Sequence, residues 1–302
     1  MNLQERAGTF DRLRPRLRVH AYRMLGSLSE AEDAVQETYI RWHQAAAAEV
    51  RSPEAWLITA LTRICIDQLR AARARRETYI GSWLPEPLLT EADAGGADLV
   101  EFAADLSMAL LMVLERLTPV ERAAFLLHDV FEHDYAAVAA AIGKSEAACR
   151  QILHRARERV QADRPRFAVA PEQRARLLDR FLAATRNGDT AGLKALFADD
   201  ITLWSDGGSK AKAALNPIHG ADKVARFFLG ITGKQPPGAR PEIRQINGEP
   251  GLVGYVDGMP YFSLTIEVAA GVITAIYTIS NPDKLRHLRG GRGGPHVSTG
   301  PT

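Results

Sequence analysis

The stretch YAAVAAAIGKSEAACRQILHRARERV, residues 135–160, decides the fold of the middle of the chain. Apolar residues recur at helical spacing on both sides of Gly143 and Lys144, and Ser145 stands where the cap of a second helix is needed. Two short helices joined by a glycine-containing turn, with arginines on the second, are typical of a helix-turn-helix. The stretch therefore predicts a DNA-binding domain of this kind.

The second helix of this stretch separates into an apolar face and a polar face. At about 100° per residue, Cys149, Ile152 and Leu153 fall on one stripe, and Gln151 and His154 lie opposite. Glutamine and histidine can reach base edges in the major groove and arginines suit phosphates, although a solvated helix surface would also be polar. The turn, the cap and the arginines together favour DNA binding. The predicted DNA-contacting residues are Lys144, Ser145, Arg150, Gln151, His154, Arg155 and Arg157.

Residues 1–76 also predict helices. Apolar spacings of three and four are interrupted at Gly26-Ser27, and Ser52-Pro53 supplies an N-cap and a first-turn proline for a third helix. That helix ends in a cluster of arginines, which would complement the negative end of its dipole or bind phosphates. We expect a helical bundle whose third helix carries a basic end.

The charge of the chain is informative by segment and not as a total. The 302 residues sum to a net charge of +2, and their 46% hydrophobic content excludes a mostly disordered chain. Residues 1–76, 135–165 and 166–302 carry +4, +3 and +5, whereas residues 77–134 carry −10. Basic blocks around an acidic connection fit two nucleic-acid contacts, although ordinary helical surfaces beside an acidic linker would give the same values.

The acidic connection contains one apolar segment. From Ile80 to Ala97 the helical pattern fails, and glycines and prolines stand among the acids. Residues 83–88, WLPEPL, place a tryptophan and other large apolar residues where a passive linker would be polar. We therefore predict a docking segment that its two prolines hold extended.

The remainder of the chain changes in composition and predicts an α+β domain. Helical spacing marks residues 172–187, 193–197 and 221–230. Alternating apolar residues mark strands at 201–203, 243–246, 252–256, 261–268 and 272–279. Helices followed by a meander predict a curved antiparallel sheet over helices. Beyond Leu288 we expect a disordered glycine-rich tail.

The cysteines and the hydropathy pattern favour a cytosolic protein without a metal or cofactor. Cys65 and Cys149, the only two cysteines, each lie in an apolar helical pattern, so a disulfide framework is not expected. We find no apolar run of the length that a signal peptide or a membrane span needs. The eight histidines show no metal-ligand spacing.

Three motifs in this order resemble extracytoplasmic-function sigma factors of bacterial RNA polymerase. Residues 33–41, DAVQETYIR, resemble the core-polymerase-binding segment of sigma region 2, and residues 56–70, WLITALTRICIDQLR, resemble the helix that opens the −10 element. Residues 117–122, LTPVER, followed by the helix-turn-helix, resemble region 4, which recognises the −35 element. The resemblance implies a promoter-specificity subunit whose partners are promoter DNA and core RNA polymerase, through the beta and beta-prime subunits.

The resemblance also implies roles for individual residues of the first block. The polar side of the second helix would bind core polymerase, and the third helix would capture unstacked bases with cations and an aromatic ring, although Trp56 would also suit the helical core. The residues implied for polymerase binding are Asp33, Gln36, Glu37 and Arg41. Those implied for the −10 element are Trp56, Arg63, Asp67, Arg70, Arg73, Arg75 and Arg76.

The C-terminal part resembles SnoaL-like domains of the nuclear transport factor fold, as found in a subgroup of these sigma factors. The signatures are residues 83–87, WLPEP, 206–210, DGGSK, and 281–285, NPDKL, and they imply regulation of the sigma factor within one chain. Ser209 stands in place of a usual third glycine, and Arg63 in place of an asparagine that contacts promoter bases in many relatives. The residues implied for interdomain control are Trp83, Leu84, Pro85, Glu86, Pro87, Asp206, Gly207, Gly208, Lys210, Asn281, Pro282, Asp283 and Lys284.

The turn at residues 206–210 offers a mechanism for this control. Its glycines give it a mobile backbone, and Asp206 and Lys210 are expected to grip residues 83–87 and so fix the separation of the two DNA-reading domains. An ordinary hairpin turn beside a loosely packed linker is the alternative.

Other functions for the C-terminal domain stay open. The same fold hosts isomerases and cyclases that use an Asp or His base and a Tyr donor, but no acid/base pair here has a spacing that demands catalysis. We expect a non-enzymatic protein. The alternatives are a DNA-binding regulator whose C-terminal domain senses a small molecule or acts as an isomerase- or cyclase-type enzyme, and a conventional operator-binding regulator. The candidate pocket residues are His219, Tyr255, Asp257, Tyr261 and Tyr277.

The expected fold class is a multidomain chain, with two all-α sigma domains, a helical bundle and then a helix-turn-helix, followed by an α+β SnoaL-like cone with a curved antiparallel sheet. We expect a protein that is cytoplasmic, has no membrane partner and is monomeric when free, with an unidentified small ligand in the C-terminal pocket left open. The expected boundaries are 1–78 for region 2, 79–104 for the linker, 105–165 for region 4, 170–288 for the SnoaL-like domain and 289–302 for the tail.

Overall fold

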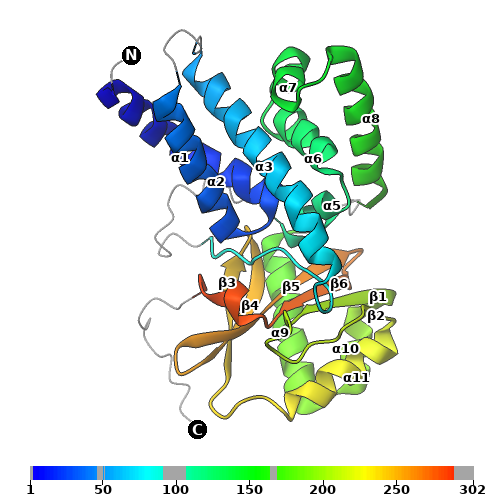
Figure 1. Ribbon diagram of the computed structural model, residues 1–302. Helices are drawn as coiled ribbons and strands as arrows, with labels where there is room; N and C mark the ends of the chain where they lie inside the picture. Colours follow the sequence, from blue (N-terminus) through cyan, green and yellow to red (C-terminus); the bar gives the residue numbers. More distant parts are fainter. Residues whose placement is uncertain (1–2, 46–49, 51, 91–106, 164–168, 289–302) are drawn as a thin grey trace. The chain divides into compact units, whose positions relative to one another are not determined.

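The chain divides into two compact units in the computed structural model, which describes residues 3–45, 50, 52–90, 107–163 and 169–288 (Figure 1). Unit 1 contains residues 1–86 and 102–166, and unit 2 contains residues 87–101 and 167–302. The expected tail and the expected linker residues 91–104 lie outside the described residues. Within the described part, no helix has the length and the hydropathy of a membrane span.

Unit 1 begins with the three predicted helices. The break between the first two lies at Gly26, whose φ is 68°, and at Ser27, whose hydroxyl accepts a hydrogen bond from the Glu30 amide at 3.3 Å. The three helices pack on one another through buried side chains that include Leu17, Trp42 and Leu61. Their bounds are α1 (Leu3–Leu25), α2 (Leu28–Gln44) and α3 (Pro53–Glu77).

The second part of unit 1 contains the predicted helix-turn-helix. Thr118 and Glu121 form a capping box at the start of α6, and the π-helix η4 follows α6 directly, which the apolar spacing does not predict. Gly143 ends α7 with φ 66°, the left-handed conformation that glycine adopts without strain. The elements are α5 (Met108–Glu115), α6 (Pro119–Phe125), η4 (Leu126–Val130), α7 (Tyr135–Ile142) and α8 (Glu146–Asp163).

The apolar stripe of α8 faces the core of unit 1, as predicted. Cys149, Leu153 and Ala156 are fully buried, and α8 packs against α6 and α7. Both cysteines are free and buried. The opposite side of α8 is therefore the side that remains for a partner.

Unit 2 combines four helices of the described residues with one six-stranded sheet. The strand order is β2-β1-β6-β5-β4-β3, and neighbouring strands are antiparallel except for β1 and β6, which run parallel. The helices are α9 (Pro171–Asn187), α10 (Thr190–Leu196), α11 (Ala221–Thr232) and α12 (Pro282–Leu285). The strands are β1 (Phe197–Asp206), β2 (Ile218–His219), β3 (Arg240–Ile246), β4 (Glu249–Val256), β5 (Met259–Ala269) and β6 (Val272–Ile279).

One face of this sheet forms the core of unit 2 with α9, α10 and α11. The cluster joins Phe181 and Phe228 of the helices to Leu252, Leu264 and Ile276 of the strands. Register explains the choice of face, because Leu252 lies opposite Leu264 and neighbouring residues along each strand point the other way. The predicted order, all-helical domains followed by an α+β domain, is confirmed.

Candidate nucleic-acid interface

An open groove of about 480 Å³ runs beside the N-terminal half of α3 in unit 1. Its volume falls in the range of ligand-binding pockets. An aromatic ring, two guanidinium groups and several small side chains form its wall. The lining residues are Arg41, Ser52, Ala55, Trp56, Thr59, Ala60 and Arg63.

Trp56 both packs on the helical core and lines the groove. Its ring packs on the fully buried ring of Trp42, with the centroids 5.4 Å apart and the planes at 50°. Trp56 itself is half-buried and lines the groove. The core therefore fixes an indole on which an unstacked base could stack.

The groove brings together two arginines that the sequence places in different sites. Arg41, implied for polymerase binding, lines the groove with Arg63, implied for the −10 element. The Arg41 Nε donates to Glu37 Oε1 at 2.8 Å on the exposed side of α2. Arg63 is exposed and also donates to two main-chain carbonyls of α7.

The other residues implied for the −10 element follow Arg63 along α3. Asp67 and Arg70 are exposed and form an ion pair of 3.1 Å across one helical turn. Residues 73, 75 and 76 belong to the last turns of α3, but their side chains lie outside the described part of the chain. The phosphate-clamp role of Arg73, Arg75 and Arg76 stays a prediction.

The exposed surface of α2 carries both polar and apolar side chains. Asp33 and Gln36 are exposed, as expected for residues that meet a partner. Sequence analysis missed Tyr39 and Ile40, which are 36% and 43% exposed beside them. Their signal in the sequence is that large apolar side chains occur off the buried stripe of α2.

The outer side of α8 presents the predicted recognition residues. Gln151, His154 and Lys144 are exposed, and the Ser145 hydroxyl accepts the Ala148 amide at 3.3 Å as the helix cap. The Arg150 guanidinium lies 4.9 Å from the ring centroid of Tyr135. These contacts leave the polar edge of α8 available for a DNA groove.

Two acidic residues hold arginines of α8 in place. Arg157 forms a two-pronged ion pair with Asp129, and this hydrogen bonding raises the pKa of the guanidinium. The side chain of Glu121, 7% exposed, pairs with Arg159 at 2.6 Å and with Arg155 at 3.7 Å. Sequence analysis did not anticipate this bracing, because Asp129 and Arg157 are 28 residues apart.

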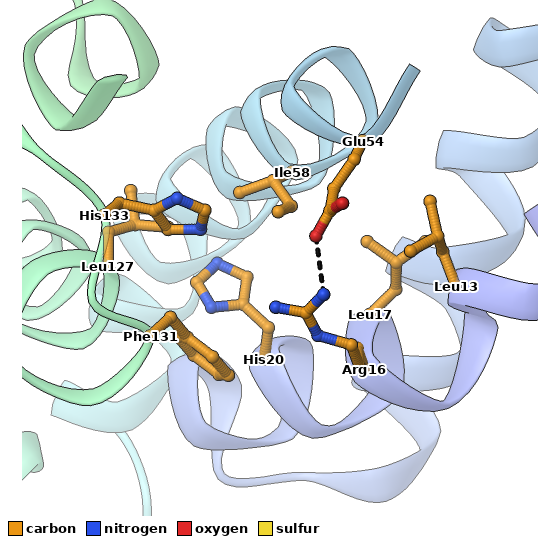
Figure 2. Close-up of a pocket in the computed structure, with 9 residues that line it drawn as sticks. All are labelled: Leu13, Arg16, Leu17, His20, Glu54, Ile58, Leu127, Phe131 and His133. Atoms are coloured by element: carbon orange, nitrogen blue, oxygen red, sulfur yellow. Dashed lines mark hydrogen bonds and ion pairs between the residues drawn. The ribbon is translucent and has the colours of Figure 1, made fainter. Parts of the chain in front are cut away.

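A small cavity of about 20 Å³ lies where α1 and α3 meet η4 and the residues that follow it (Figure 2). Its wall carries two histidines, His20 of α1 and His133. Burial, with the positive charges nearby, lowers the pKa of His20 to about 3, and burial also lowers the pKa of His133. His20 Nε2 is 2.9 Å from Thr62 Oγ1, and no partner is found for His20 Nδ1. Both imidazoles are therefore neutral at pH 7.

The first half of the predicted docking segment binds within unit 1. Glu86 accepts hydrogen bonds from the Ser27 hydroxyl at 2.9 Å and from the Leu28 amide at 2.8 Å, so its carboxylate caps the N-terminus of α2. The Glu86 carbonyl accepts from the Tyr22 hydroxyl at 2.6 Å. A Cβ on Gly26 would lie 2.8 Å from the Trp83 ring, so only glycine allows this close approach.

The second half of the segment binds within unit 2. Leu89 forms an antiparallel bridge with Ile246 of the edge strand β3, and the Thr90 amide donates to Gln245 O at 3.0 Å. Asn247 follows β3 directly. Its main-chain N–H donates to Leu88 O at 2.8 Å, and its side-chain Oδ1 accepts from the Leu88 N–H at 3.1 Å. The linker thus extends the sheet by a short strand-like contact.

The two C-terminal signatures meet each other inside unit 2. Asp206 and Lys284, both buried, form an ion pair of 2.7 Å, and Lys210 pairs with Asp283 at 2.5 Å. Hydrogen bonding to Lys210 lowers the pKa of Asp283. Asn281 caps α12 by accepting the Asp283 amide at 3.1 Å. The signatures therefore brace α12 on β1, and the expected grip on residues 83–87 stays a prediction.

The departure at Ser209 has a visible consequence. Gly208 and Ser209 have φ values of 57° and 60°, in the left-handed region that glycine adopts freely and serine rarely. Gly207 is required for space, because a Cβ there would lie 2.2 Å from Ala211 O. The turn keeps the glycine-type backbone with serine at its third position.

The five candidate pocket residues of the C-terminal domain are not brought together by the described contacts. The Tyr277 hydroxyl bonds to Glu267 and its ring stacks on Trp204, while the Tyr255 hydroxyl donates to Leu288 O at 3.0 Å. His219 is exposed beside Thr202, and Asp257 lies in a hairpin turn with φ 50°. Tyr261 has a buried hydroxyl without a hydrogen-bond partner, and burial raises its pKa.

Comparisons with known proteins agree with this geometry. The family models of sigma-70 region 2 and sigma-70 region 4 match residues 9–75 and 107–160. The chain is 39% identical over 288 residues to the ECF RNA polymerase sigma factor SigJ of Mycobacterium tuberculosis (strain ATCC 25618 / H37Rv), covering 91% of this chain and 92% of SigJ.

Further relatives cover the chain to a similar extent. The probable ECF RNA polymerase sigma factor SigI of Mycobacterium tuberculosis (strain CDC 1551 / Oshkosh) is 31% identical over 276 residues, with 91% and 92% of the two chains covered. The crystal structure of Mycobacterium tuberculosis SigJ matches with a TM-score of 0.76 at 37% identity, covering 93% of this chain and 98% of that one. The chain belongs to the extracytoplasmic-function family of RNA polymerase sigma factors.

Proposed function

We propose that this sigma factor captures an unstacked base of the −10 element in the groove beside α3. The single observation that carries this proposal is that Trp56, held by its contact with Trp42, lines one groove together with Arg41 and Arg63. An aromatic face binds a base by stacking, and guanidinium groups attract the phosphates on either side. Core polymerase, through its beta and beta-prime subunits, would bind the exposed side of α2, at Asp33, Gln36, Tyr39 and Ile40.

The outer side of α8 would recognise the −35 element. Gln151 and His154 are exposed at its centre and would contact base edges, while Lys144, Arg150 and Arg155 would contact phosphates. Asp129 holds Arg157 and would thereby limit it to a supporting role. This division assigns sequence recognition to the exposed centre of α8, apart from Arg157, which Asp129 holds.

The base-capture proposal is tested by substituting Trp56 in the full chain. Stacking on an aromatic ring is worth about 1–3 kcal/mol per base, so Trp56→Ala should reduce open-complex formation with core polymerase about 5- to 100-fold. Trp56→Phe keeps a ring and should retain most of the activity. The measurement is the fluorescence of 2-aminopurine placed in the −10 element of a target promoter.

The control for this test is binding to core polymerase, which both variants should keep. Equal open-complex formation by Trp56→Ala and the unaltered chain would contradict base capture. Loss of core binding by Trp56→Ala would show instead that the indole matters only for packing on Trp42.

We further propose that unit 2 regulates unit 1 through the linker and without catalysis. Residues 83–86 bind within unit 1 and residues 88–90 bind within unit 2, so Pro87 alone separates the two attachments. Regulation is favoured over catalysis because the five candidate pocket residues are not brought together by the described contacts. The protein would act in the cytoplasm, where the polymerase acts, without a membrane partner and as a monomer when free.

A further inference from the structure

Arg63 joins the two parts of unit 1 that are expected to contact DNA. Its Nη2 donates to Ala140 O at 2.8 Å, and its Nε donates to Ala141 O at 3.2 Å. Both carbonyls lie in the last turn of α7, the first helix of the helix-turn-helix. Carbonyls in the last turn of a helix lack partners within the helix and carry partial negative charge, so a guanidinium is a favourable cap for them.

The same guanidinium lines the groove that holds Trp56. An arginine that caps α7 has two of its N–H groups directed at protein carbonyls and away from a nucleic-acid phosphate or base. The two uses therefore compete for one side chain. An asparagine at this position would be too short to bridge two successive carbonyls of a neighbouring helix in this way.

Other contacts join α1 to the second part of unit 1. The Arg122 Nη1 of α6 donates to Met24 O of α1 at 2.7 Å and pairs with Glu115 at 2.7 Å, and it is buried. The rings of Phe131 and His20 meet in a T-shaped contact with their centroids 5.1 Å apart (Figure 2). The Arg23 guanidinium lies 5.4 Å from the centroid of the Phe131 ring. Arg63, in contrast to the residues of these contacts, also lines the groove.

We propose that Arg63 is a latch, which holds the helix-turn-helix against α3 in the free protein and is released when the guanidinium takes promoter DNA. The proposal rests on the proposed function of the groove, because DNA at Trp56 is what competes for the latch. Binding of single-stranded DNA and separation of α7 from α3 are then coupled events.

The latch is tested by charge changes on α7 that leave the groove itself unaltered. Ala140 is exposed, so Ala140→Arg places a second cation beside Arg63 and should open the latch, whereas Ala140→Asp should tighten it. Ala136, also exposed on α7 and one turn earlier, gives the matched control Ala136→Arg. A second pair compares Arg63→Ala with Arg70→Ala, since Arg70 is exposed on the same helix and its described ion pair, with Asp67, lies within α3.

Two readouts are taken on the full chain. Dyes attached at Asp11→Cys of α1 and Gln161→Cys of α8 report the distance between these two helices by energy transfer. The two native cysteines are buried, which raises the pKa of their thiols and slows their labelling. A fluorescent 12-nucleotide single-stranded DNA of mixed sequence reports occupation of the groove. Ala140→Arg should lower energy transfer and bind this DNA at least threefold more tightly, and Arg63→Ala should lower energy transfer but bind it more weakly.

The two controls should match the unaltered chain in energy transfer. Unchanged energy transfer in both Ala140→Arg and Arg63→Ala, with DNA binding retained, would overturn the latch and leave the groove proposal intact. An equal drop in Ala136→Arg would also overturn it, since the effect would not depend on proximity to Arg63. Absence of DNA binding by every chain, even with core polymerase present, would instead defeat the proposed function on which the latch rests.

Discussion

His20 shows how one buried residue makes the stability of unit 1 depend on pH. It is 3% exposed, so burial disfavours its charged form, and the Arg23 guanidinium, together with His133 once that is protonated, adds positive charge nearby. Arg16 and Glu54 also line the cavity and neutralise each other through an ion pair (Figure 2). A neutral imidazole is therefore required in the packed unit.

The folded and unfolded chains bind the proton of His20 differently. Its pKa is about 3 when buried and near 6.5 when unfolded, so the unfolded chain takes up the proton first as the pH falls. The stabilisation is complete above pH 6.5 and is lost progressively toward pH 3. Between pH 7 and pH 5 the free energy of unfolding should fall by about 2 kcal/mol on account of this group.

Denaturant unfolding of the full chain at pH 7 and pH 5, followed by tryptophan fluorescence, measures this loss. His20→Gln removes the titrating group and should reduce the difference between the two pH values by about that amount. His154→Gln, at an exposed position of α8, should leave the difference as it is. An unchanged pH dependence in His20→Gln would contradict the account of this residue.

At the scale of elements, the linker segment 83–90 makes hydrogen bonds to distant elements that helical or strand periodicity does not predict. The buried carboxylate of Glu86 caps α2 by accepting a hydrogen bond from the Leu28 amide at the N-terminus of this helix, where negative charge is favourable. Glu86→Gln removes the charge and replaces one of the two acceptor oxygens by an NH2 donor, so that either the Ser27 hydroxyl or the Leu28 amide loses its acceptor. The free energy of unfolding of unit 1 should fall by about 1–3 kcal/mol.

Hydrogen exchange followed by mass spectrometry checks this cap directly. In Glu86→Gln, the amides of residues 83–86 and of the first turn of α2 should exchange faster than in the unaltered chain. Glu32→Gln is the matched control, because Glu32 is an exposed glutamate of α2 whose pair with Arg18 lies at the surface. Equal protection of residues 83–86 in Glu86→Gln and the unaltered chain would show that the segment is held by other contacts.

The elements themselves follow from the sequence, and most contacts between them do not. The apolar stripe of α8 and the cap at Ser145 are local patterns, and both are confirmed. Glu86 and Ser27 are 59 residues apart, and Arg63 and Ala141 are 78 apart, so no periodicity connects them. The parallel pairing of β1 with β6 could not be predicted from the sequence either. The alternation of apolar residues predicts which face of the sheet a side chain occupies and does not predict which strand lies beside it.

Parts of the candidate site could be predicted only because known motifs carried them. The residues of α8 follow from helical faces alone, whereas the role of Trp56 needed the resemblance, since a tryptophan at helical spacing also suits a core. The structure adds Arg41 to the groove, a residue that the resemblance assigns to polymerase. Side chains from separate helices meet there, and a linear pattern does not report such meetings.

At the scale of the whole molecule, one chain combines two expected DNA contacts in unit 1 with a unit 2 that is proposed to regulate them. Near the start of the acidic connection between the basic blocks, Glu86 binds within unit 1, and Leu88 and Thr90 bind within unit 2. A segment so anchored can transmit a change in unit 2 to unit 1. Removal of unit 2, or of α12 alone, should therefore change transcription without abolishing core binding.

The most direct test of the central claim is transcription in vitro with purified core polymerase on a known target promoter. Three proteins are compared: the full chain, a truncation near residue 167 that lacks unit 2, and a longer truncation near residue 280 that lacks α12. We predict that the full chain directs initiation at this promoter and that both truncations start at the same site with altered yield. Failure of all three proteins to direct any initiation would contradict the account.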